Sequence, residues 1–346
     1  MRPMKFSALP EPAGRLGASL FLLCALLSCT ARAQTPGRAP GNLAGRADKG
    51  AQSSAESPQL VILDTDIGDD IDDAFALALV LRSPEFKLLG ITTEFGDTEL
   101  RARLVDRYLK AVGRADIPVA AGVETPAPNH FTQAEYARGE PDRKHEDAVG
   151  FLLAQIGAHP GEITLICIGP LVNVQAAIAR DPAAFRKLKR VVMMGGSVYR
   201  GYDDMKAGDR QRPPDAEWNI KCDPAGAQAL VNSGVPVFML PLDSTQVHLA
   251  LPQLLSIVEH GSALTNQLSL LYHEWTEGRE WPSPTLYDPV AVTYALRPDL
   301  CPATPMRLEV DGQGYTRPAA GAPNAEVCRH LDEAGFLSLL MGRLLQ

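Results

Sequence analysis

The sequence of 346 residues is long enough for one large domain, and 45% hydrophobic and 21% charged residues are typical of an ordinary globular protein. Its formal net charge of −8 argues against a protein that binds nucleic acid polymers through clustered Lys and Arg. The negative charge does not exclude binding of a neutral small molecule.

The first 33 residues are typical of a signal peptide. Basic residues precede an apolar run, Leu16–Leu27, that is too short to anchor a protein in a bilayer. Two cleavage signals follow it. Ala31-Arg32-Ala33 suits a general signal peptidase, whereas Leu26-Leu27-Ser28-Cys29 resembles a bacterial lipobox and would make Cys29 a lipid-anchored N-terminus. We therefore expect export, either to the periplasm or to a membrane as a lipoprotein.

Residues 34–58 are rich in Pro, Gly, Ala and Ser, which predicts a flexible linker. Residues 59–346 are then expected to form a single domain without internal repeats. Short β-branched runs alternate with helical patterns along it. The expected strands are Leu60–Leu63, Lys87–Thr92, Thr164–Cys167, Arg190–Met193 and Val237–Leu240. The helices between them include Asp73–Arg82, Glu99–Val112, Ala148–Ala158, Val172–Ala179 and Pro224–Asn232.

This alternation predicts an α/β fold with a single open, mainly parallel, Rossmann-like sheet flanked by helices. In such sheets the ligand binds at the carboxyl ends of the strands. The first strand runs there into a cluster of six carboxylates within ten residues: Asp64, Asp66, Asp69, Asp70, Asp72 and Asp73.

The acidic cluster points to a bound cation. Two like charges about 4 Å apart repel by on the order of 4 kcal/mol at an effective dielectric constant of ~20. A hard cation relieves this repulsion, and a donor set made only of oxygens suits Ca²⁺ or Mg²⁺. A solvated helix N-terminus would explain Asp72 or Asp73 alone, but not Asp64 and Asp66 on the strand side as well.

Five motifs resemble those of the inosine–uridine-type nucleoside hydrolases, in the same order and over the chain from about Leu60. They are Asp64-Thr65-Asp66-Ile67-Gly68 ahead of Asp72-Asp73-Ala74, Gly169-Pro170-Leu171-Val172-Asn173, Met193-Met194-Gly195-Gly196, Glu217-Trp218-Asn219-Ile220 ahead of Asp223-Pro224, and Tyr287-Asp288-Pro289-Val290-Ala291-Val292. The resemblance implies the nucleoside hydrolase fold and hydrolysis of the bond between ribose and base in a small nucleoside.

The resemblance also implies roles for individual residues. Ca²⁺ would be bound by Asp66, Asp73, Asp288 and the backbone carbonyl of Val172. Asp66 would also accept a proton from a calcium-bound water. The ribose would be held by Asp72, Glu217, Asn219 and Met194. From the residues alone, Asp288 could instead be a helix N-cap before Pro289.

The chain departs from the family pattern in three places. The segment between Gly68 and Asp72 is two residues longer than in the best-known members, so Asp70 is an alternative to Asp72 or Asp73. Asp97 stands where many members have Asn, and is expected at the ribose. Tyr287 replaces a histidine, so either Tyr287 or His145 is expected to assist the leaving base.

An aromatic-rich stretch that includes Trp275 and Arg279 is expected either to contact the base or to pack as an ordinary helix. Two other functions stay open. Asp64-x-Asp66 also resembles a haloacid-dehalogenase-type phosphatase with Asp64 as the nucleophile. An exported protein that binds a nucleoside or ribose without catalysis is the third hypothesis.

The cysteines of the domain show no metal-binding spacing. Cys301 and Cys328 could form a disulfide in an oxidising compartment, but spacing does not show it, and we expect free thiols. The sequence leaves the oligomeric state open, a homo-oligomer included.

Overall fold

The computed structural model describes residues 57–126, 131–203, 212–277 and 283–346, which all belong to one compact unit. The signal peptide expected over residues 1–33 and nearly all of the linker lie outside these ranges, so both stay predictions. Within the described ranges, no helix combines the length and the apolar character needed to cross a membrane.

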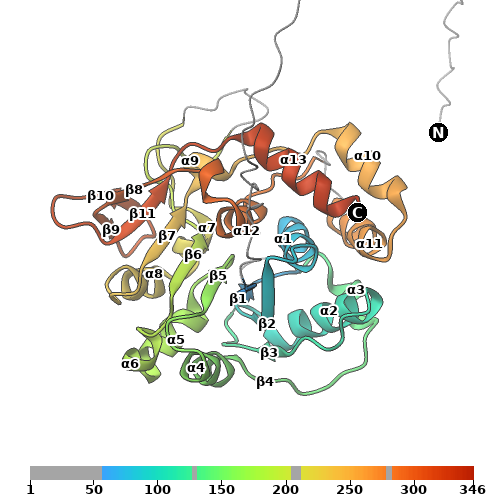
Figure 1. Ribbon diagram of the computed structural model, residues 1–346, viewed down its shortest axis with the longest axis horizontal. Helices are drawn as coiled ribbons and strands as arrows, with labels where there is room; N and C mark the ends of the chain where they lie inside the picture. The colour runs from blue at the N-terminus through green and yellow to red at the C-terminus, as the bar shows by residue number, and fades with distance from the viewer. Residues whose placement is uncertain (1–56, 127–130, 204–211, 278–282) are drawn as a thin grey trace, which may run out of the picture. The chain divides into compact units, whose positions relative to one another are not determined.

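A nine-stranded sheet runs through this unit (Figure 1). All neighbouring strands are parallel except the last pair, which is antiparallel. From edge to edge the strands are β4 (Glu146–Asp147), β3 (Val119–Ala121), β2 (Phe86–Thr93), β1 (Gln59–Thr65), β5 (Thr164–Cys167), β6 (Arg190–Met194), β7 (Val237–Leu240), β11 (Ala325–Cys328) and β8 (Ala303–Met306). Two short strands, β9 (Leu308–Val310) and β10 (Thr316–Pro318), form a separate antiparallel pair. The predicted open, mainly parallel sheet is confirmed.

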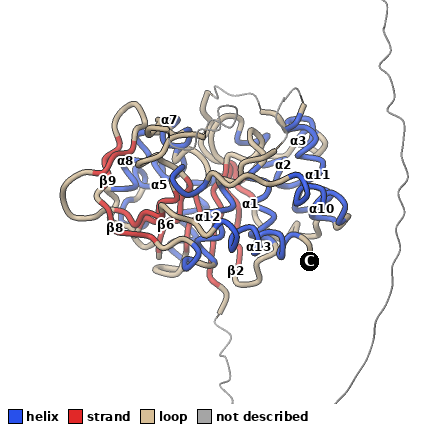
Figure 2. The backbone as a smooth tube through the Cα atoms, turned by 90° about the horizontal axis from the view of Figure 1, so that it is seen from above, coloured by secondary structure: helices blue, strands red, loops and turns tan. Residues whose placement is uncertain are grey.

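Helices cover both faces of the sheet (Figures 1 and 2). One face is covered by α4 (Ala148–Ala158), α5 (Val172–Arg180), α6 (Pro182–Phe185) and α8 (Pro224–Val231). The other is covered by α1 (Asp72–Leu81), α2 (Thr98–Ala111), α12 (Asp288–Leu296) and α13 (Glu333–Leu344), with α10 (Leu251–His260) and α11 (Ala263–Thr276) packed beyond α1. Three short helices, α3 (Ala134–Arg138), α7 (Trp218–Cys222) and α9 (Leu242–Thr245), and a 3-10 turn at Pro298–Leu300 lie in the connections.

The elements follow from apolar runs in the sequence. The centre of β1 and all of β5 are buried, as expected for strands covered on both faces. In α1 every residue from Asp72 to Val80 is buried, because the helix lies between the sheet, α11 and α12. Each of the five predicted strands and five predicted helices is found, and no bound differs by more than two residues. Burial of α1 therefore places two carboxylates at its start away from bulk water.

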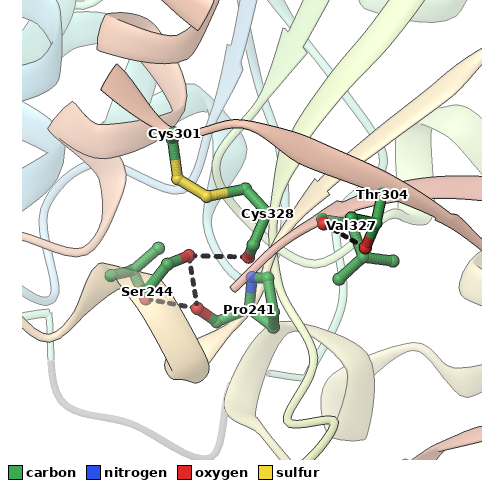
Figure 3. Close-up of a disulfide and its surroundings, with 7 residues drawn as sticks. Pro241, Ser244, Cys301, Thr304, Val327 and Cys328 are labelled. Carbon is green, nitrogen blue, oxygen red and sulfur yellow. Dashed lines mark hydrogen bonds between the residues drawn. A yellow bond between two sulfur atoms is a disulfide. The ribbon is translucent and has the colours of Figure 1, made fainter. Parts of the chain in front are cut away.

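A disulfide joins Cys301 and Cys328, so the expectation of free thiols was wrong (Figure 3). The chain returns antiparallel from β8 to β11, which places Cys328 opposite Ala303, and the two cysteine Cα atoms lie 5.6 Å apart. The separation of 27 residues between the two cysteines does not by itself predict this antiparallel pairing. The carbonyl of Cys328 also accepts a hydrogen bond from Ser244 Oγ at 2.9 Å, which ties β11 to α9.

Candidate active site

A cavity of about 440 Å³ lies at the carboxyl ends of β1, β5 and β6. Its residues fall into two groups by burial. The buried group, which we call the floor, consists of Asp66, Asp72, Asp73, Ile168, Met194, Glu217, Asn219 and Asp288. The partly exposed group, which we call the rim, consists of Asp69, Asp70, Thr132, Tyr202, Trp218 and Tyr287. A cavity of this size suits a small organic molecule.

The starts of α1 and α12 meet at the floor. Carboxylate oxygens of Asp72, Asp73 and Asp288 lie within 4.8 Å of one another. Asp72 Oδ2 accepts the backbone N–H groups of Tyr287 and Asp288, both at 3.1 Å, and so joins the two helix starts. Asp73 Oδ1 accepts a hydrogen bond from Thr65 Oγ1 at the end of β1, at 2.5 Å. The two helix N-termini stabilise negative charge there, but they offset only part of the charge of the three carboxylates.

Burial and mutual repulsion disfavour the ionised form of the floor aspartates. Burial raises the pKa of Asp66 to about 7. Burial first, and then repulsion among the acids, raises the pKa values of Asp72, Asp73 and Asp288 well above their usual range. Such a set of buried oxygen donors fits a hard divalent cation, which would hold all of them ionised.

The nearest buried cation, Arg101, contacts the backbone of this loop rather than the four floor aspartates. Its guanidinium donates to the carbonyls of Phe95 at 2.7 Å, of Ile67 at 3.0 Å and of Asp66. It also pairs with the Asp69 carboxylate at 3.1 Å. Arg101 therefore fixes the acidic loop after β1, and its charge offsets only part of the burial and repulsion that raise the pKa values of Asp66 and Asp73.

Glu217, Asn219 and Met194 meet on the other side of the floor. The Glu217 carboxylate is held by the backbone N–H groups of Gly196, Asn219 and Ile220, at 2.8, 2.9 and 3.1 Å, and caps α7. Asn219 Nδ2 donates to the carbonyl of Met194 at 3.3 Å. Four of the five residues expected at the ribose, Asp72, Met194, Glu217 and Asn219, thus line one cavity with Asp66.

Val172 is buried at the start of α5 and is not among the residues that line the cavity. The turn before it nevertheless comes close to Asp66. A Cβ atom at Gly169 would lie 2.7 Å from Asp66 Oδ1, so this approach requires glycine. The role of the Val172 carbonyl stays a prediction.

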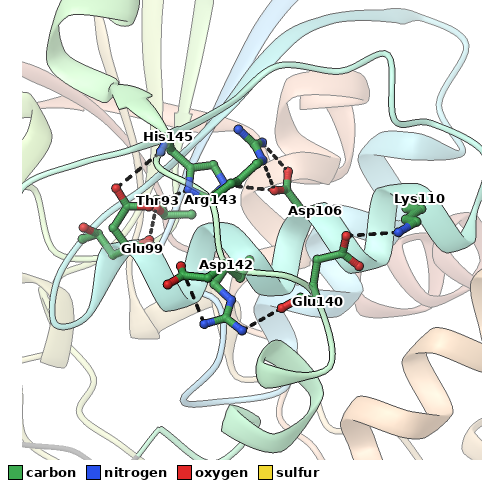
Figure 4. Close-up of polar contacts among 10 residues, drawn as sticks. Thr93, Glu99, Asp106, Lys110, Glu140, Asp142, Arg143 and His145 are labelled. Atoms are coloured by element: carbon green, nitrogen blue, oxygen red, sulfur yellow. Dashed lines mark hydrogen bonds and ion pairs between the residues drawn. The ribbon is translucent and has the colours of Figure 1, made fainter.

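None of His145, Asp97 and Trp275 lines the cavity. This corrects the roles predicted for His145 and Asp97, and of the two alternatives for Trp275 it leaves helix packing. The His145 side chain is fully buried, with Nδ1 2.6 Å from Glu99 Oε2 and Nε2 2.9 Å from Asp106 Oδ2 (Figure 4). Burial lowers its pKa, but hydrogen bonds to both carboxylates outweigh this effect and raise the pKa above its ordinary value.

Trp275 packs in the core against Tyr272, with ring centroids 5.9 Å apart, as the helix-packing alternative predicted. Asp97 is exposed and caps α2 by accepting the N–H of Leu100 at 2.9 Å. Arg279 lies outside the described residues.

Asp64 also lies outside the cavity. It is fully buried, and its Oδ1 accepts hydrogen bonds from Thr92 Oγ1 at 2.5 Å and Asn173 Nδ2 at 2.8 Å. A phosphatase nucleophile would have to line the cavity, so this position argues against the phosphatase hypothesis. Next to Asp64 lies Glu94, which sequence reasoning missed and whose pKa is raised, chiefly by burial. The sequence did offer a signal for it, because Glu94 directly follows β2 just as Asp66 directly follows β1.

The rim holds the other residues that were missed. Thr132 and Tyr202 lie in irregular segments without a recognisable pattern. Trp218 lies inside the Glu217 motif and could have been found there. The predicted catalytic residue Tyr287 is on the rim, with its ring 6.3 Å from that of Tyr202.

Comparison with known proteins decides the family. The model of the family described as "inosine-uridine preferring nucleoside hydrolase" matches residues 61–338. The chain belongs to this family.

Sequence relatives and solved structures support the same family. The nucleoside hydrolase described here is 32% identical to an uncharacterized protein of Schizosaccharomyces pombe, over 82% of this chain and 98% of that protein. It is 31% identical to the pyrimidine-specific ribonucleoside hydrolase RihA of an Enterobacter species, over 83% and 97%. Among solved structures, a plant nucleoside hydrolase has a TM-score of 0.72 at 26% identity (83% and 99% covered). A purine-preferring ribonucleoside hydrolase from Gardnerella vaginalis has a TM-score of 0.70 at 25% identity (83% and 98% covered).

Membership in the family makes this nucleoside hydrolase an N-glycosidase that acts on small ribonucleosides. The phosphatase hypothesis is thereby excluded. The family is generally metal-dependent, and the floor supplies the acidic cluster that a metal needs.

Proposed function

We propose that this nucleoside hydrolase is an exported, calcium-dependent enzyme that splits ribonucleosides into ribose and free base. The observation that carries the proposal is the floor, where carboxylate oxygens of the buried Asp72, Asp73 and Asp288 lie within 4.8 Å of one another, in the cavity that Asp66 also lines. Ca²⁺ accepts a cage made mostly of protein oxygens, whereas Mg²⁺ keeps several waters, so the floor favours calcium.

The residues proposed to hold the ion are Asp66, Asp73, Asp288 and the carbonyl of Val172. Asp72 already accepts two backbone N–H groups through Oδ2, which suits it better to a ribose hydroxyl. A bound calcium ion would supply positive charge that orients the ribose hydroxyls and makes a nearby water more acidic.

The protein's own groups account for the remaining chemistry. Asp66, which lines the cavity, would accept a proton from the water that attacks the anomeric carbon. Glu217, Asn219 and Asp72 bind the ribose, and the ring of carboxylates stabilises the positive charge that develops on the sugar as the C–N bond breaks. Tyr287, which lies on the rim, would donate a hydrogen bond to the departing base.

The disulfide supports export. Disulfides form and persist in oxidising compartments such as the bacterial periplasm, and Cys301 and Cys328 are both buried in the core of the domain. A signal peptide over residues 1–33, with or without lipidation at Cys29, would deliver the chain there.

The purified protein with calcium should release free ribose from a panel of purine and pyrimidine ribonucleosides. Asp66→Asn should lower kcat by roughly a thousandfold or more while the protein stays folded, because this one change removes both the general base and a metal-binding carboxylate. The surface variant Asp299→Asn, which changes the same charge in an exposed ion pair, serves as the control and should keep full activity. Tight nucleoside binding with no ribose released would instead indicate a non-catalytic binding protein.

A further inference from the structure

The rim differs in chemistry from the floor. It presents three aromatic rings, Tyr202, Trp218 and Tyr287. The rings of Tyr202 and Tyr287 meet edge to face at 81°, and Tyr202 Oη accepts the backbone N–H of Trp218 at 2.9 Å. The backbone N–H of Tyr202 is held in turn by the Asp215 carboxylate at 3.0 Å. The aromatic part of the rim is therefore held in place by its own contacts.

Two carboxylates complete the rim, Asp69 and Asp70, and they come from the segment that is longer than in the best-known family members. Asp69 is held by the Arg101 guanidinium at 3.1 Å and, through its carbonyl, by Thr132 Oγ1 at 2.8 Å. The carbonyl of Asp70 accepts Gln133 Nε2 at 2.8 Å, and its carboxylate lies close enough to Tyr287 for its charge to act on that residue.

The arrangement of floor and rim orients a nucleoside. If the floor binds the ribose, as the proposed function requires, the base lies against the rim, next to its three aromatic residues and two carboxylates. Among the described residues that line the cavity there is no Lys, Arg or His. Aromatic rings together with carboxylates form the environment in which proteins bind organic cations.

We propose that the rim selects ribosides whose base is an aromatic cation, namely a pyridinium joined to the ribose through its ring nitrogen. The inference rests on the proposed function and narrows its substrate class. Cation–π attraction and the rim carboxylates, Asp70 more than the Arg101-paired Asp69, favour the charged ring over a neutral base of similar size.

The reaction of such a substrate also suits the residues present. As the bond between C1′ and the ring nitrogen breaks, its electron pair stays on the nitrogen, and the base leaves as a neutral pyridine. The oxygen of water bonds to C1′, and the proton lost from this water passes to Asp66 and then to solvent. The base itself needs no proton, so a rim of tyrosines and aspartates without a Lys or His is sufficient.

The test compares hydrolysis of the riboside of 3-carbamoylpyridinium with hydrolysis of uridine and inosine. We expect kcat/KM to be highest for the pyridinium riboside. Asp70→Asn should lower the ratio of kcat/KM for the pyridinium riboside to kcat/KM for uridine by roughly tenfold. Asp69→Asn should lower this ratio less, because the Asp69 carboxylate is paired with Arg101. Asp142→Asn, at an exposed position away from the cavity, removes the same charge and should leave both substrates unaffected. Unchanged melting temperatures of the variants would show that they are folded.

A binding measurement gives a second readout. The cation 3-carbamoyl-1-methylpyridinium should inhibit uridine hydrolysis more strongly than neutral 3-carbamoylpyridine, and Asp70→Asn should remove this difference. If uridine and inosine are hydrolysed but neither preference for the cation is found, the inference is wrong and the proposed function stands. If no riboside of either kind releases ribose, the proposed function itself is wrong.

Discussion

At the scale of single residues, Tyr287 is the clearest departure from the family pattern. Its backbone is held by Asp72 and its ring lies on the rim, where burial raises the pKa of its hydroxyl. A hydroxyl that keeps its proton can still donate a hydrogen bond to a leaving base. We expect Tyr287→Phe to lower uridine hydrolysis at least tenfold and to leave a nitrophenyl riboside nearly unaffected, because nitrophenolate departs without such help.

His145→Ala is the companion variant. Its imidazole is buried between Glu99 and Asp106, so we expect loss of stability without selectivity between the two substrates. An equal loss on both substrates in Tyr287→Phe would instead place Tyr287 in sugar binding or folding. A selective loss in His145→Ala would mean that His145 acts on the leaving base.

At the scale of elements, the loop between β1 and α1 depends on α2. Arg101, in the first turn of α2, is buried and donates to the carbonyls of Asp66 and Ile67 in that loop. We expect Arg101→Met to weaken calcium binding by at least tenfold, measured by calorimetry, because the ligand loop loses its anchor. Arg101→Lys should recover only part of this affinity, since a single ammonium cannot replace the planar fork. Calcium affinity unchanged in Arg101→Met would show that the loop holds its own shape.

The disulfide connects the end of α12, through the 3-10 turn, with β11. Because it closes a loop of 27 residues, we expect Cys301→Ser to lower the free energy of unfolding by about 3 kcal/mol, measured by denaturant titration. Cys167→Ser is a control for the loss of a thiol, since Cys167 is buried and unpaired. An equal effect of the two variants would mean that packing at Cys301, rather than the cross-link, is what matters.

Elements with strong local patterns could be predicted from the sequence, and long-range contacts could not. The aliphatic run before Asp64 and the apolar helix after Asp73 each determine their own structure, so β1 and α1 were found. Glu217 and Asp288 were found through motifs that the family shares. His145 was misplaced because its partners, Glu99 and Asp106, lie about 40 residues earlier on α2. Thr132 and Tyr202 on the rim were missed because their segments reach the cavity only in the folded chain.

For the whole molecule, the acidic cluster makes stability depend on pH and metal together. Without metal, burial raises the pKa of Asp64 from 3.8 to about 6 and that of Asp66 to about 7. Between about pH 4 and pH 7 the folded chain therefore binds more protons than the unfolded chain. The free energy of unfolding then falls as the pH rises through this window, and the stability that these acids retain at low pH is lost above about pH 7.

Calcium should reverse this trend, because it binds the ionised carboxylates and only the folded chain presents them together. We expect the rise in melting temperature on adding calcium to be small near pH 5 and large near pH 8, measured by calorimetry against a chelator-treated sample. Asp73→Asn should reduce both the calcium effect and the pH dependence of the chelated protein, since it removes one of the repelling charges. Asp299→Asn, at an exposed position, should change neither. Equal stabilisation at both pH values would contradict the assignment, because a cation bound outside the buried carboxylates would not compete with their protons.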